Sequence, residues 1–450
     1  MMSLTEAAAV LGASVRGNDA RFSGVSTDTR TLRRGDLFVA LRGERFDGHG
    51  FLANAAAAKA AAAVVDSRFA GELPLPAAVV DDTRLALGAL ARHWRARFSP
   101  ALIAVTGSNG KTTVKEMLAS ILRSHAGNEA VLATAGNLNN DIGVPLTLLR
   151  MRQAHRWCAI ELGMNHKGEI AYLADIARPG VALVNNAQRE HLEFMNSVEE
   201  VAAENATVYG ALAAEGVAVV NADDAHAAFF RACAGGRHVI EFGLGSGAQV
   251  TARHDLKPLS SELWLRTPRG EAHATLAIPG LHNVRNALAA AAAAHAAGIE
   301  AGTIGEGLTS FRPYTGRLQV KQARGGATLI DDTYNANPDS VRAAIDVLAS
   351  CPAPTVLVLG DMGEVGTQGA EFHREVGAYA RAKGIASLLA LGEATPAAVQ
   401  AFGAGGRHFD TVEELVSHVS GASILVKGSR FMRMERVVAA LTGVQAQGGH

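Results

Sequence analysis

The chain has 450 residues, of which 48% are hydrophobic and 19% charged, so it can bury sizeable cores and is not a disordered protein. Its 42 basic and 43 acidic side chains leave a net charge of −1, which excludes the strongly basic surface typical of proteins that bind nucleic acid or anionic membranes. Since domains commonly have about 100–200 residues, a chain of this length is expected to form about three domains.

The three cysteines are scattered, at positions 158, 233 and 351, and do not have the spacing of a disulfide framework or a zinc site. The first residues lack the basic start and long apolar segment of a signal peptide. The alanine-rich stretch at 286–294 falls well short of the roughly 20 apolar residues that span a bilayer. We therefore expect a soluble, cytoplasmic and monomeric protein that binds no nucleic acid and inserts into no membrane.

Residues 1–98 are predicted to form a small α/β domain. Short apolar runs in it have the length of buried strands, and Asp82 is placed to cap a helix. The glycine-rich polar loop at 42–50, together with Thr29 and Arg30, offers hydroxyl and charged groups to a ligand. An ordinary surface turn is an equally good interpretation of this loop.

A second domain is predicted over residues 99–312, and its first strand, loop and helix are the strongest signal in the chain. The apolar run 101–106 has the length and β-branched content of a buried parallel strand, and apolar side chains recur at helical spacing from residue 114. Between them lies Gly-Ser-Asn-Gly-Lys-Thr-Thr at 107–113. Because a helix N-terminus behind a glycine loop points free N–H groups at an anion, this arrangement predicts a nucleoside triphosphate site.

Each part of the loop suits phosphate binding. Gly107 and Gly110 let the backbone approach an anion closely, Lys111 supplies a point charge, and the Thr112 hydroxyl suits Mg²⁺. A strict P-loop would have glycine where Val105 stands, so the motif is the shorter G-x-x-G-K-T-T form. A glycine turn with an incidental lysine is the alternative interpretation.

Polar residues follow the next strands of the predicted parallel sheet. Glu161 ends the apolar run 157–161, where a carboxylate could hold Mg²⁺, because ligands of open parallel sheets bind beyond the carboxyl ends of the strands. His191 follows another strand end and is equally compatible with a structural role. The asparagine-rich stretch 134–145 reads either as a long turn or as a loop whose amides hold a phosphate or peptide group.

The pattern changes after residue 240. Alternating segments at 262–266 and 272–278 predict half-buried antiparallel strands. Asn283 and Asn286 then lie three apart at the start of a helix, where their amides could contact an adenine edge or a ribose, or simply cap the helix.

Residues 313–450 are predicted to form a third domain. Repeated strand-plus-helix units without a second phosphate loop predict a doubly wound α/β fold. Polar clusters at its strand ends, at 331–340, 360–364 and 427–430, are expected to face whatever the domain closes upon.

Together these motifs resemble the Mur ligases of peptidoglycan synthesis over nearly the whole chain. The stretches that carry the resemblance are Gly-Asn-Leu-Asn-Asn-Asp-Ile-Gly at 136–143, Glu-Leu-Gly-Met-Asn-His-Lys-Gly-Glu-Ile at 161–170, Asp-Asp-Thr-Tyr-Asn-Ala-Asn-Pro-Asp-Ser at 331–340 and Leu-Gly-Asp-Met-Gly-Glu at 359–364. They are similar to the D-alanyl-D-alanine-adding branch, whereas the diaminopimelate- or lysine-adding branch has a motif of Asp-Tyr-Ala-His-Thr-Pro type in place of 331–340.

The resemblance implies an α/β fold with a UDP-sugar-binding N-terminal domain, a central P-loop-type ATPase domain with a parallel sheet, and a C-terminal Rossmann-like domain that closes on ATP and the incoming dipeptide. It implies an ATP-dependent ligase that joins D-Ala-D-Ala to UDP-MurNAc-tripeptide through an acyl phosphate, with ATP and Mg²⁺ as cofactors.

The resemblance also implies roles for individual residues. Those expected to hold ATP are Gly107, Asn109, Gly110, Lys111, Thr112, Thr113, Asn283, Asn286, Arg317, Asp332 and Asn335. Those expected to serve metal are Thr112, Glu161 and His191, and those expected to be catalytic are Lys111, Glu161 and His191. Those expected to bind the UDP-sugar substrate are Thr29, Arg30, Arg45, Asp47, Asn137, Asn139 and Asn140.

Three alternatives stay open at this point. Another ATP-dependent amide ligase of the same architecture, such as a folylpolyglutamate synthase, would use the same phosphate loop. A nucleotide-gated binding module would bind ATP without amine-dependent ADP formation. A simple P-loop phosphotransferase would leave the two flanking domains unexplained.

One position departs from the family pattern. The family usually has a carbamoylated, metal-bridging lysine fourteen residues after the histidine, and Asn205 stands there in this chain. A neutral amide cannot supply the charge of a carbamate. The resemblance implies that His191 serves a second Mg²⁺. This second metal is therefore held differently, with Glu204 the nearest carboxylate in sequence, or it binds weakly.

Because Asn205 cannot form a carbamate, we predict that added bicarbonate does not stimulate the enzyme. The measurement is ATP-dependent phosphate release in CO₂-depleted buffer, with and without bicarbonate, at fixed pH and ionic strength. A clear stimulation would show that another residue carries a carbamate.

Overall fold

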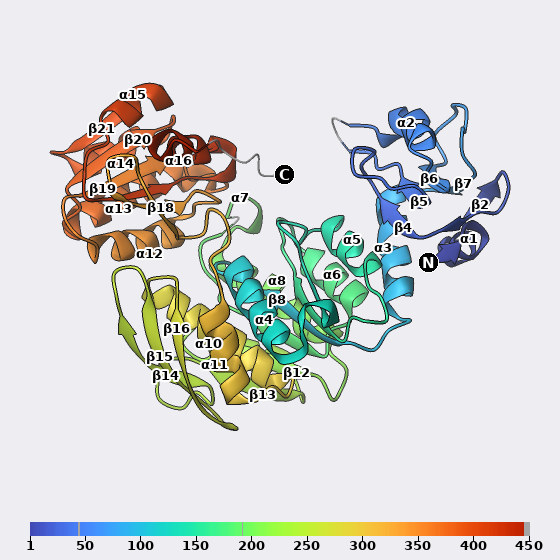
Figure 1. Ribbon diagram of the computed structural model, residues 1–450, viewed down its shortest axis with the longest axis horizontal. Coiled ribbons are helices and arrows are strands. Elements are labelled where there is room, and N and C mark those ends of the chain that lie inside the picture. Colours follow the sequence, from blue (N-terminus) through green and yellow to red (C-terminus); the bar gives the residue numbers. More distant parts are fainter. Residues whose placement is uncertain (44–45, 191, 445–450) are drawn as a thin grey trace. The chain divides into compact units, whose positions relative to one another are not determined.

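The computed structural model describes residues 1–43, 46–190 and 192–444 (Figure 1). Its contacts divide the chain into two compact units. The first comprises Met1–Ala104, Glu129–Met164 and Glu169–Pro179, and the second Val105–Asn128, Asn165–Gly168 and the chain from Gly180 onward. The domain boundaries placed after residues 98 and 312 stay predictions.

The N-terminal part of the first unit is built on a five-stranded sheet of order β2-β7-β6-β5-β4. Its strands are β2 (Ser14–Arg16), β4 (Gly24–Ser26), β5 (Asp36–Val39), β6 (Ala62–Asp66) and β7 (Ala77–Val80). All pairs are parallel except that of β2 with β7. The short strands β1 (Met2–Ser3) and β3 (Arg21–Phe22) pair separately. The helices are α1 (Leu4–Leu11), α2 (Leu52–Ala57) and α3 (Thr83–Arg95), with a 3₁₀ turn at Gly48–Phe51.

Helix α3 starts where the sequence predicts. The Asp82 carboxylate accepts the N–H groups of Arg84 and Leu85 at 2.7 and 3.0 Å, which satisfies two donors that the first helical turn leaves unpaired.

The rest of the first unit contains β9 (Val131–Ala133) and β10 (Trp157–Glu161), which pair in parallel, and helices α5 (Gly143–Leu149) and α6 (Glu169–Ala177). The interpretation of 134–145 as a loop is wrong at its end, because α5 begins at Gly143. Oδ1 of Asn140 accepts the N–H groups of Ile142 and Gly143, and the apolar residues that follow are buried. The turn that Asn140 makes before Gly143 and the buried residues that follow therefore allow a helix that the asparagine run does not predict.

Strand β8 (Ala101–Thr106) begins in the first unit and ends in the second. In the second unit, β11 (Val181–Val184), β12 (Val217–Asn221) and β13 (His238–Phe242) pair in parallel. The helices of this part are α4 (Lys111–Ala126), α7 (Leu192–Met195), α8 (Val198–Ala206) and α9 (Ala227–Ala234). The predicted strand, glycine loop and helix around residues 101–123 are confirmed as β8 and α4.

The predicted change of pattern after residue 240 is also confirmed. Strands β14 (Thr251–Leu256), β15 (Ser261–Thr267) and β16 (Gly270–Leu276) form an antiparallel sheet, and β15 alternates buried and more exposed side chains. Helices α10 (Leu281–Ala296) and α11 (Ala301–Ser310) follow, and small alanine side chains let α10 be buried along most of its length.

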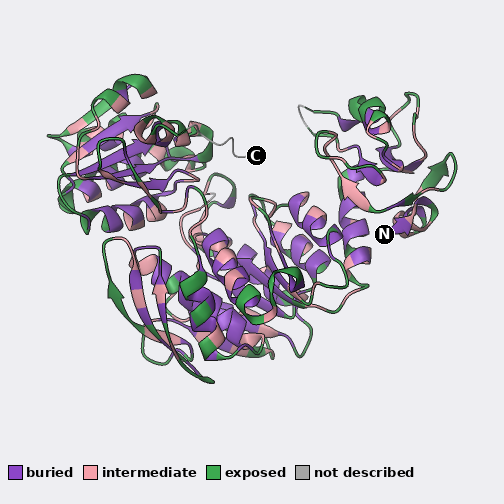
Figure 2. Ribbon diagram, in the orientation of Figure 1, coloured by how far each residue is buried: buried purple, intermediate pink, exposed green. Residues whose placement is uncertain are grey.

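The C-terminal sheet has the order β17-β18-β22-β19-β20-β21, and only β17 runs antiparallel. The strands are β17 (Gln319–Gln322), β18 (Thr328–Asp332), β19 (Thr355–Gly360), β20 (Ser387–Leu391), β21 (Gly406–Phe409) and β22 (Ser423–Lys427). The helices are α12 (Pro338–Ala349), α13 (Gly369–Ala382), α14 (Pro396–Phe402), α15 (Val412–Ser417) and α16 (Glu435–Thr442). Figure 2 shows the inner strands of this sheet buried and the outer helix faces exposed, as expected of a parallel sheet covered by helices, whereas the edge strands β17 and β21 are partly exposed. Of the helices in the described residues, none is long and apolar enough to cross a membrane.

Helix α11 packs against α4, the helix that follows the glycine loop 107–110. Ser120 Oγ of α4 donates to the Gly307 carbonyl at 2.7 Å, and a Cβ at Gly307 would lie 2.4 Å from the Ile121 Cα. The two helices can approach this closely only because residue 307 has no side chain.

We predict that Gly307→Ala destabilises the protein by about 1–3 kcal/mol, since the added methyl meets backbone that cannot yield. Gly302→Ala in the same helix is the matched control: its Cβ would meet nothing within 4 Å, and alanine favours a helix by up to about 1 kcal/mol over glycine. Urea unfolding followed by circular dichroism compares the two. Equal stability of both variants would show that this helix contact is not tight.

Candidate functional site

The loop between β8 and α4 has a backbone that glycine alone adopts easily. The φ angles of Gly107 and Gly110 are 127° and 82°. A Cβ at Gly110 would lie 2.3 Å from Oδ1 of Asn286 and 2.8 Å from Nδ2 of Asn185. Helix α4 begins at the next residue, so the N–H groups of its first turn border this loop and can hold an anion.

Side-chain amides fix the loop. Nδ2 of Asn185 donates to the carbonyl of Asn109 at 2.7 Å and to Oδ1 of Asn286 at 3.0 Å. Asn186 accepts the N–H of Asn109 at 2.8 Å, and Asn286 donates to Oδ1 of Asn283 at 3.0 Å. The structure thus brings together three residues predicted to hold ATP, Asn109, Asn283 and Asn286, with two that the sequence reasoning did not select.

The Lys111 ammonium is fully engaged. Nζ donates to the carbonyls of Gly107 and Ser108 at 2.7 and 2.9 Å, and to the carboxylate of Glu190 at 3.0 and 3.1 Å. An ammonium has three N–H donors, so these partners use all of them. The side chains of Lys111 and Glu190 are only 13% and 11% exposed.

A cavity of about 410 Å³ in the second unit adjoins the loop, and it has the size of a small-molecule site. The predicted ATP residues that line it are Asn109, Gly110, Thr113, Asn283, Asn286, Arg317 and Asp332. The predicted ATP residues outside its lining are Gly107, Lys111, Thr112 and Asn335.

The cavity wall carries both neutral and charged donors. Burial lowers the pKa of His282 to about 4, so this imidazole is neutral at pH 7. Lys427 Nζ donates to Asp332 at 2.6 Å and to the Asn335 carbonyl at 2.8 Å, and burial lowers its pKa despite the pairing. The Arg317 guanidinium stacks 4.1 Å from the Tyr334 ring centroid, and its buried Nε has no hydrogen-bond partner among the described residues. Arg317 thus keeps an unused donor beside the cavity.

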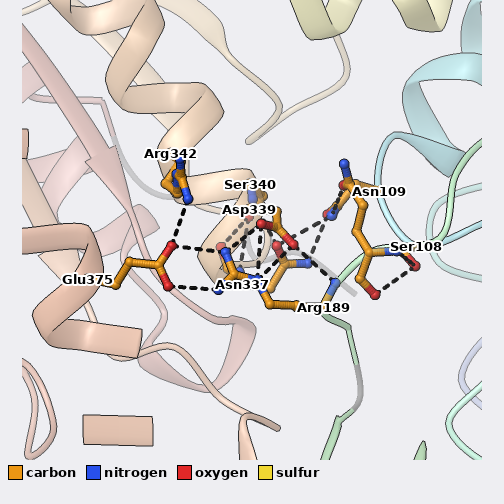
Figure 3. A network of polar contacts seen from close by, with 9 residues as sticks. Ser108, Asn109, Arg189, Asn337, Asp339, Ser340, Arg342 and Glu375 are labelled. Atoms are coloured by element: carbon orange, nitrogen blue, oxygen red, sulfur yellow. Dashed lines mark hydrogen bonds and ion pairs between the residues drawn. The ribbon is translucent and has the colours of Figure 1, made fainter. Parts of the chain in front are cut away.

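The stretch after β11 is tied to the C-terminal sheet domain through Arg189 (Figure 3). The Arg189 guanidinium donates to Asp339, at the start of α12, at 2.6 Å and to Glu375, in α13, at 2.7 Å. Its backbone N–H also donates to Asp339, at 3.0 Å. Arg342 adds a second bond to Glu375 at 2.9 Å. Hydrogen bonding from Arg189 is the main reason why the pKa of Glu375 lies below its usual 4.5.

A second link runs through Asn337, the N-cap of α12. Its Oδ1 accepts the Ser340 N–H at 2.9 Å, and its Nδ2 donates to Oδ1 of Asn109 at 2.8 Å (Figure 3). One side chain therefore caps α12 and contacts the glycine loop that precedes α4.

In the first unit, Glu161 is buried at the end of β10. Its N–H donates to Thr134 Oγ1 at 2.9 Å, and its Oε1 accepts from Nδ2 of Asn139 at 2.8 Å. The predicted residues Asn139 and Glu161 thus lie together. Asn140 instead accepts the Gly143 N–H at the start of α5, and Asn137 is exposed.

The N-terminal candidates have local partners. Arg30 pairs with Asp28 at 2.6 Å while its side chain stays 85% exposed, and Thr29 between them is half-buried. Asp47 accepts the N–H of His49 at 3.0 Å and contacts its Nδ1 at 2.6 Å. Two further candidates, Arg45 and His191, lie outside the described residues.

Asn205 is completely buried and serves the interior. Its Oδ1 accepts from Thr106 Oγ1 at 2.7 Å, and its Nδ2 donates to the Val201 carbonyl at 2.9 Å. Oε2 of the neighbouring Glu204 accepts the Gly168 N–H at 2.9 Å. Within the part of the chain that the structure describes, no three acidic, His or Cys side chains cluster as a metal site.

Sequence reasoning overlooked Asn185, Asn186, Arg189 and Glu190, although the strand-end rule that selects His191 applies to them equally. It likewise named the cluster 427–430 without selecting Lys427. All of these residues follow a parallel strand, and that position could have indicated them. The rule selects a short stretch of the chain, however, and does not tell which side chains in it form the contacts.

We predict that Arg189→Gln lowers the free energy of unfolding by about 1–3 kcal/mol at pH 7, since two carboxylates lose a charged donor. A carboxyl whose pKa is depressed by folding stabilises above its unfolded pKa and loses that contribution as pH falls. The deficit of the variant should therefore shrink below the usual Glu375 value of 4.5. Denaturant unfolding at pH 7 and at a pH below 4.5 measures the difference in unfolding free energy between variant and wild type. Arg374→Gln, which changes an exposed residue of α13, is the control. A deficit independent of pH would contradict the assignment.

Comparison with known proteins agrees with this architecture. Three family models match the chain: "Mur ligase family, catalytic domain" at 21–95, "Mur ligase middle domain" at 105–294 and "Mur ligase, glutamate ligase domain" at 316–430. The UDP-N-acetylmuramoyl-tripeptide–D-alanyl-D-alanine ligase of Escherichia coli is 41% identical over 98% of both chains.

Solved structures agree as well. MurF from Acinetobacter baumannii superposes with a TM-score of 0.91 at 35% identity, over 98% of this chain and 99% of that one. MurF ligase from Thermotoga maritima, solved with ADP, superposes with a TM-score of 0.81 at 26% identity, over 94% and 98%. The expected α/β fold with three Mur ligase domains is confirmed. The chain belongs to the Mur ligase family.

Proposed function

We propose that the protein is an ATP-dependent amide ligase that joins D-Ala-D-Ala to the terminal carboxylate of UDP-MurNAc-tripeptide, giving the UDP-MurNAc-pentapeptide of peptidoglycan synthesis. The observation that carries the proposal is full-length similarity to the E. coli ligase of that name. The cavity beside the glycine loop supports the nucleotide half of the reaction.

ATP is proposed to bind along the loop and cavity of the second unit. The N–H groups at the start of α4, with Lys111 Nζ, are suited to the β- and γ-phosphates. Asn283 and Asn286 are suited to the adenosine, because their buried amides line the cavity. Arg317 is suited to reach ATP, because its guanidinium keeps an unused donor beside the cavity. Asp332 and Asn335, which hold Lys427 near the cavity, complete the proposed set.

Mg²⁺ is proposed as the cofactor. It prefers oxygen ligands, and the Thr112 hydroxyl and the Glu161 carboxylate supply them. Both side chains are buried, and a buried carboxylate is stabilised by a cation. When bound, Mg²⁺ would neutralise phosphate charge. The role of His191 stays a prediction.

The chemistry needs activation of a poor electrophile. A carboxylate oxygen of the tripeptide attacks the γ-phosphorus of ATP, and ADP leaves. The amine of D-Ala-D-Ala then attacks the acyl phosphate carbon, a proton is lost, and phosphate is expelled as the amide forms. Phosphoryl transfer depends on charge stabilisation and in-line placement rather than on a protein nucleophile, and Lys111 supplies such charge.

The UDP-sugar substrate is proposed to bind in the first unit. The proposed residues are Thr29, Arg30, Arg45, Asp47, Asn137, Asn139 and Asn140. Arg30 offers an exposed guanidinium suited to phosphate, and Asn139 already contacts the proposed metal ligand Glu161.

The direct test is mass spectrometry of products from ATP, D-Ala-D-Ala and UDP-MurNAc-tripeptide, using tripeptides that end in diaminopimelate or in lysine. The proposal expects a pentapeptide product and stoichiometric phosphate. Phosphate release with folate and glutamate, but not with these substrates, would assign the chain to folylpolyglutamate-type chemistry. ATP binding without amine-dependent turnover would make it a binding module.

We predict that Lys111→Ala lowers ligase turnover by about 10²-fold or more, because transition-state phosphate charge loses a fixed donor. UDP-substrate affinity should be nearly unchanged. Coupled ADP release and calorimetry measure the two quantities. Lys257→Ala, which removes an exposed lysine that pairs with Asp255, is the control. Near-normal turnover of Lys111→Ala would refute the phosphate role.

A further inference from the structure

The phosphate-binding lysine of this chain is already neutralised by a carboxylate. Of the three acceptors that hold the Lys111 ammonium, two are carbonyls of the loop itself, Gly107 and Ser108, and the third is the Glu190 carboxylate. The loop carbonyls are fixed, because Ser108 and Asn109 are bonded to the stretch 186–188. A phosphate that approaches Lys111 can therefore replace only Glu190.

The Lys111–Glu190 pair is largely shielded from water. With side-chain exposures of 13% and 11%, the two charges are poorly solvated when they are separated, so breaking this pair costs more than breaking a surface ion pair. A polyphosphate brought beside an unmoved Glu190 would also meet a like charge. Both effects oppose nucleotide binding.

We propose that Glu190 is a displaceable counter-ion: it pairs with Lys111 in this structure, and it must leave the ammonium for the β- and γ-phosphates of ATP to bind. This inference rests on the proposed function only in taking Lys111 as the phosphate ligand. Glu190 acts through Lys111 and is a positioning residue.

The position of Glu190 in the chain connects the exchange of partners at Lys111 to the C-terminal sheet domain. The preceding residue, Arg189, is held by Asp339 and Glu375 through backbone and side chain (Figure 3). Movement of Glu190 away from Lys111 therefore involves the neighbouring Arg189, which is bonded to α12 and α13. Nucleotide phosphates and the C-terminal sheet domain are thereby coupled through two adjacent residues.

The test is ADP affinity of the full-length protein, measured by calorimetry with and without Mg²⁺. Glu190→Gln keeps the shape and removes the charge, so ADP should bind about tenfold more tightly than to the wild type. AMP lacks the β-phosphate that Lys111 would contact, so its affinity, measured by competition, should change less than twofold. Glu193→Gln removes an exposed carboxylate three residues on and should change neither affinity.

Further measurements distinguish an effect on nucleotide binding from a folding defect. Thermal unfolding without nucleotide verifies that Glu190→Gln is folded, and Glu190→Ala provides a second variant. In ligase assays the KM for ATP should fall while kcat does not rise, a split that a merely structural defect would not produce.

ADP affinity that is unchanged or lowered by Glu190→Gln overturns the proposal, and wild-type ligase activity in the same preparation leaves the proposed function standing. An equal gain for AMP and ADP overturns it as well, because the effect would then not pass through Lys111. Weaker ADP binding only in the presence of Mg²⁺ would make Glu190 a metal ligand instead. Failure of the wild type to bind ADP at all would overturn both proposals.

Discussion

The contact on which the site depends is the approach of two asparagine amides to Gly110. Asn185 and Asn286 lie so close that a Cβ on residue 110 would overlap both. Asn185 comes from the end of β11 and Asn286 from α10, so strand, helix and loop meet at one residue without a side chain. A buried amide that makes all its hydrogen bonds is held rigidly, and a buried amide without partners costs free energy. Moving any one of these residues would leave buried amides unpaired, so the arrangement is stable.

The charged groups follow a different rule. Lys111 is paired with Glu190, Lys427 with Asp332, and Arg189 with Asp339 and Glu375. Burying an unpaired charge costs more than burying a paired one, so a site that gathers several cations needs counter-ions of its own. Lys111 has such a counter-ion in Glu190, whereas the backbone N–H groups at the start of α4 carry no full charge and need none. Arg317 differs because its stacking on Tyr334 accommodates the guanidinium without using Nε.

The sequence predicts elements whose signal is local. β8 and α4 follow from an apolar run, two glycines and helical spacing, and the α3 cap follows from Asp82. Contacts between distant residues leave no such trace: Arg189 binds partners 150 and 186 residues further along the chain. The start of α5 was hidden because asparagines that favour turns also cap helices, and only the burial of the following residues decides between the two. For Asn283 and Asn286, both sequence interpretations hold in part, since the amides bond one another and also line the cavity.

The departures from family and motif patterns, at Val105 and Asn205, both lie at the end of β8, because Asn205 of α8 accepts a hydrogen bond from Thr106. Val105, where a strict P-loop has glycine, is a fully buried strand residue, so β8 extends to Thr106 and the loop turns only at Gly107. The Thr106 hydroxyl donates to Oδ1 of Asn205, and Nδ2 of Asn205 donates to the Val201 carbonyl. A lysine in place of Asn205 would have no acceptor to offer Thr106, because an ammonium only donates. The asparagine thus secures the last residue of β8 before the backbone turns, and a shorter glycine loop, with fewer amides of its own to fix it, gains support from side chains packed around the strand end.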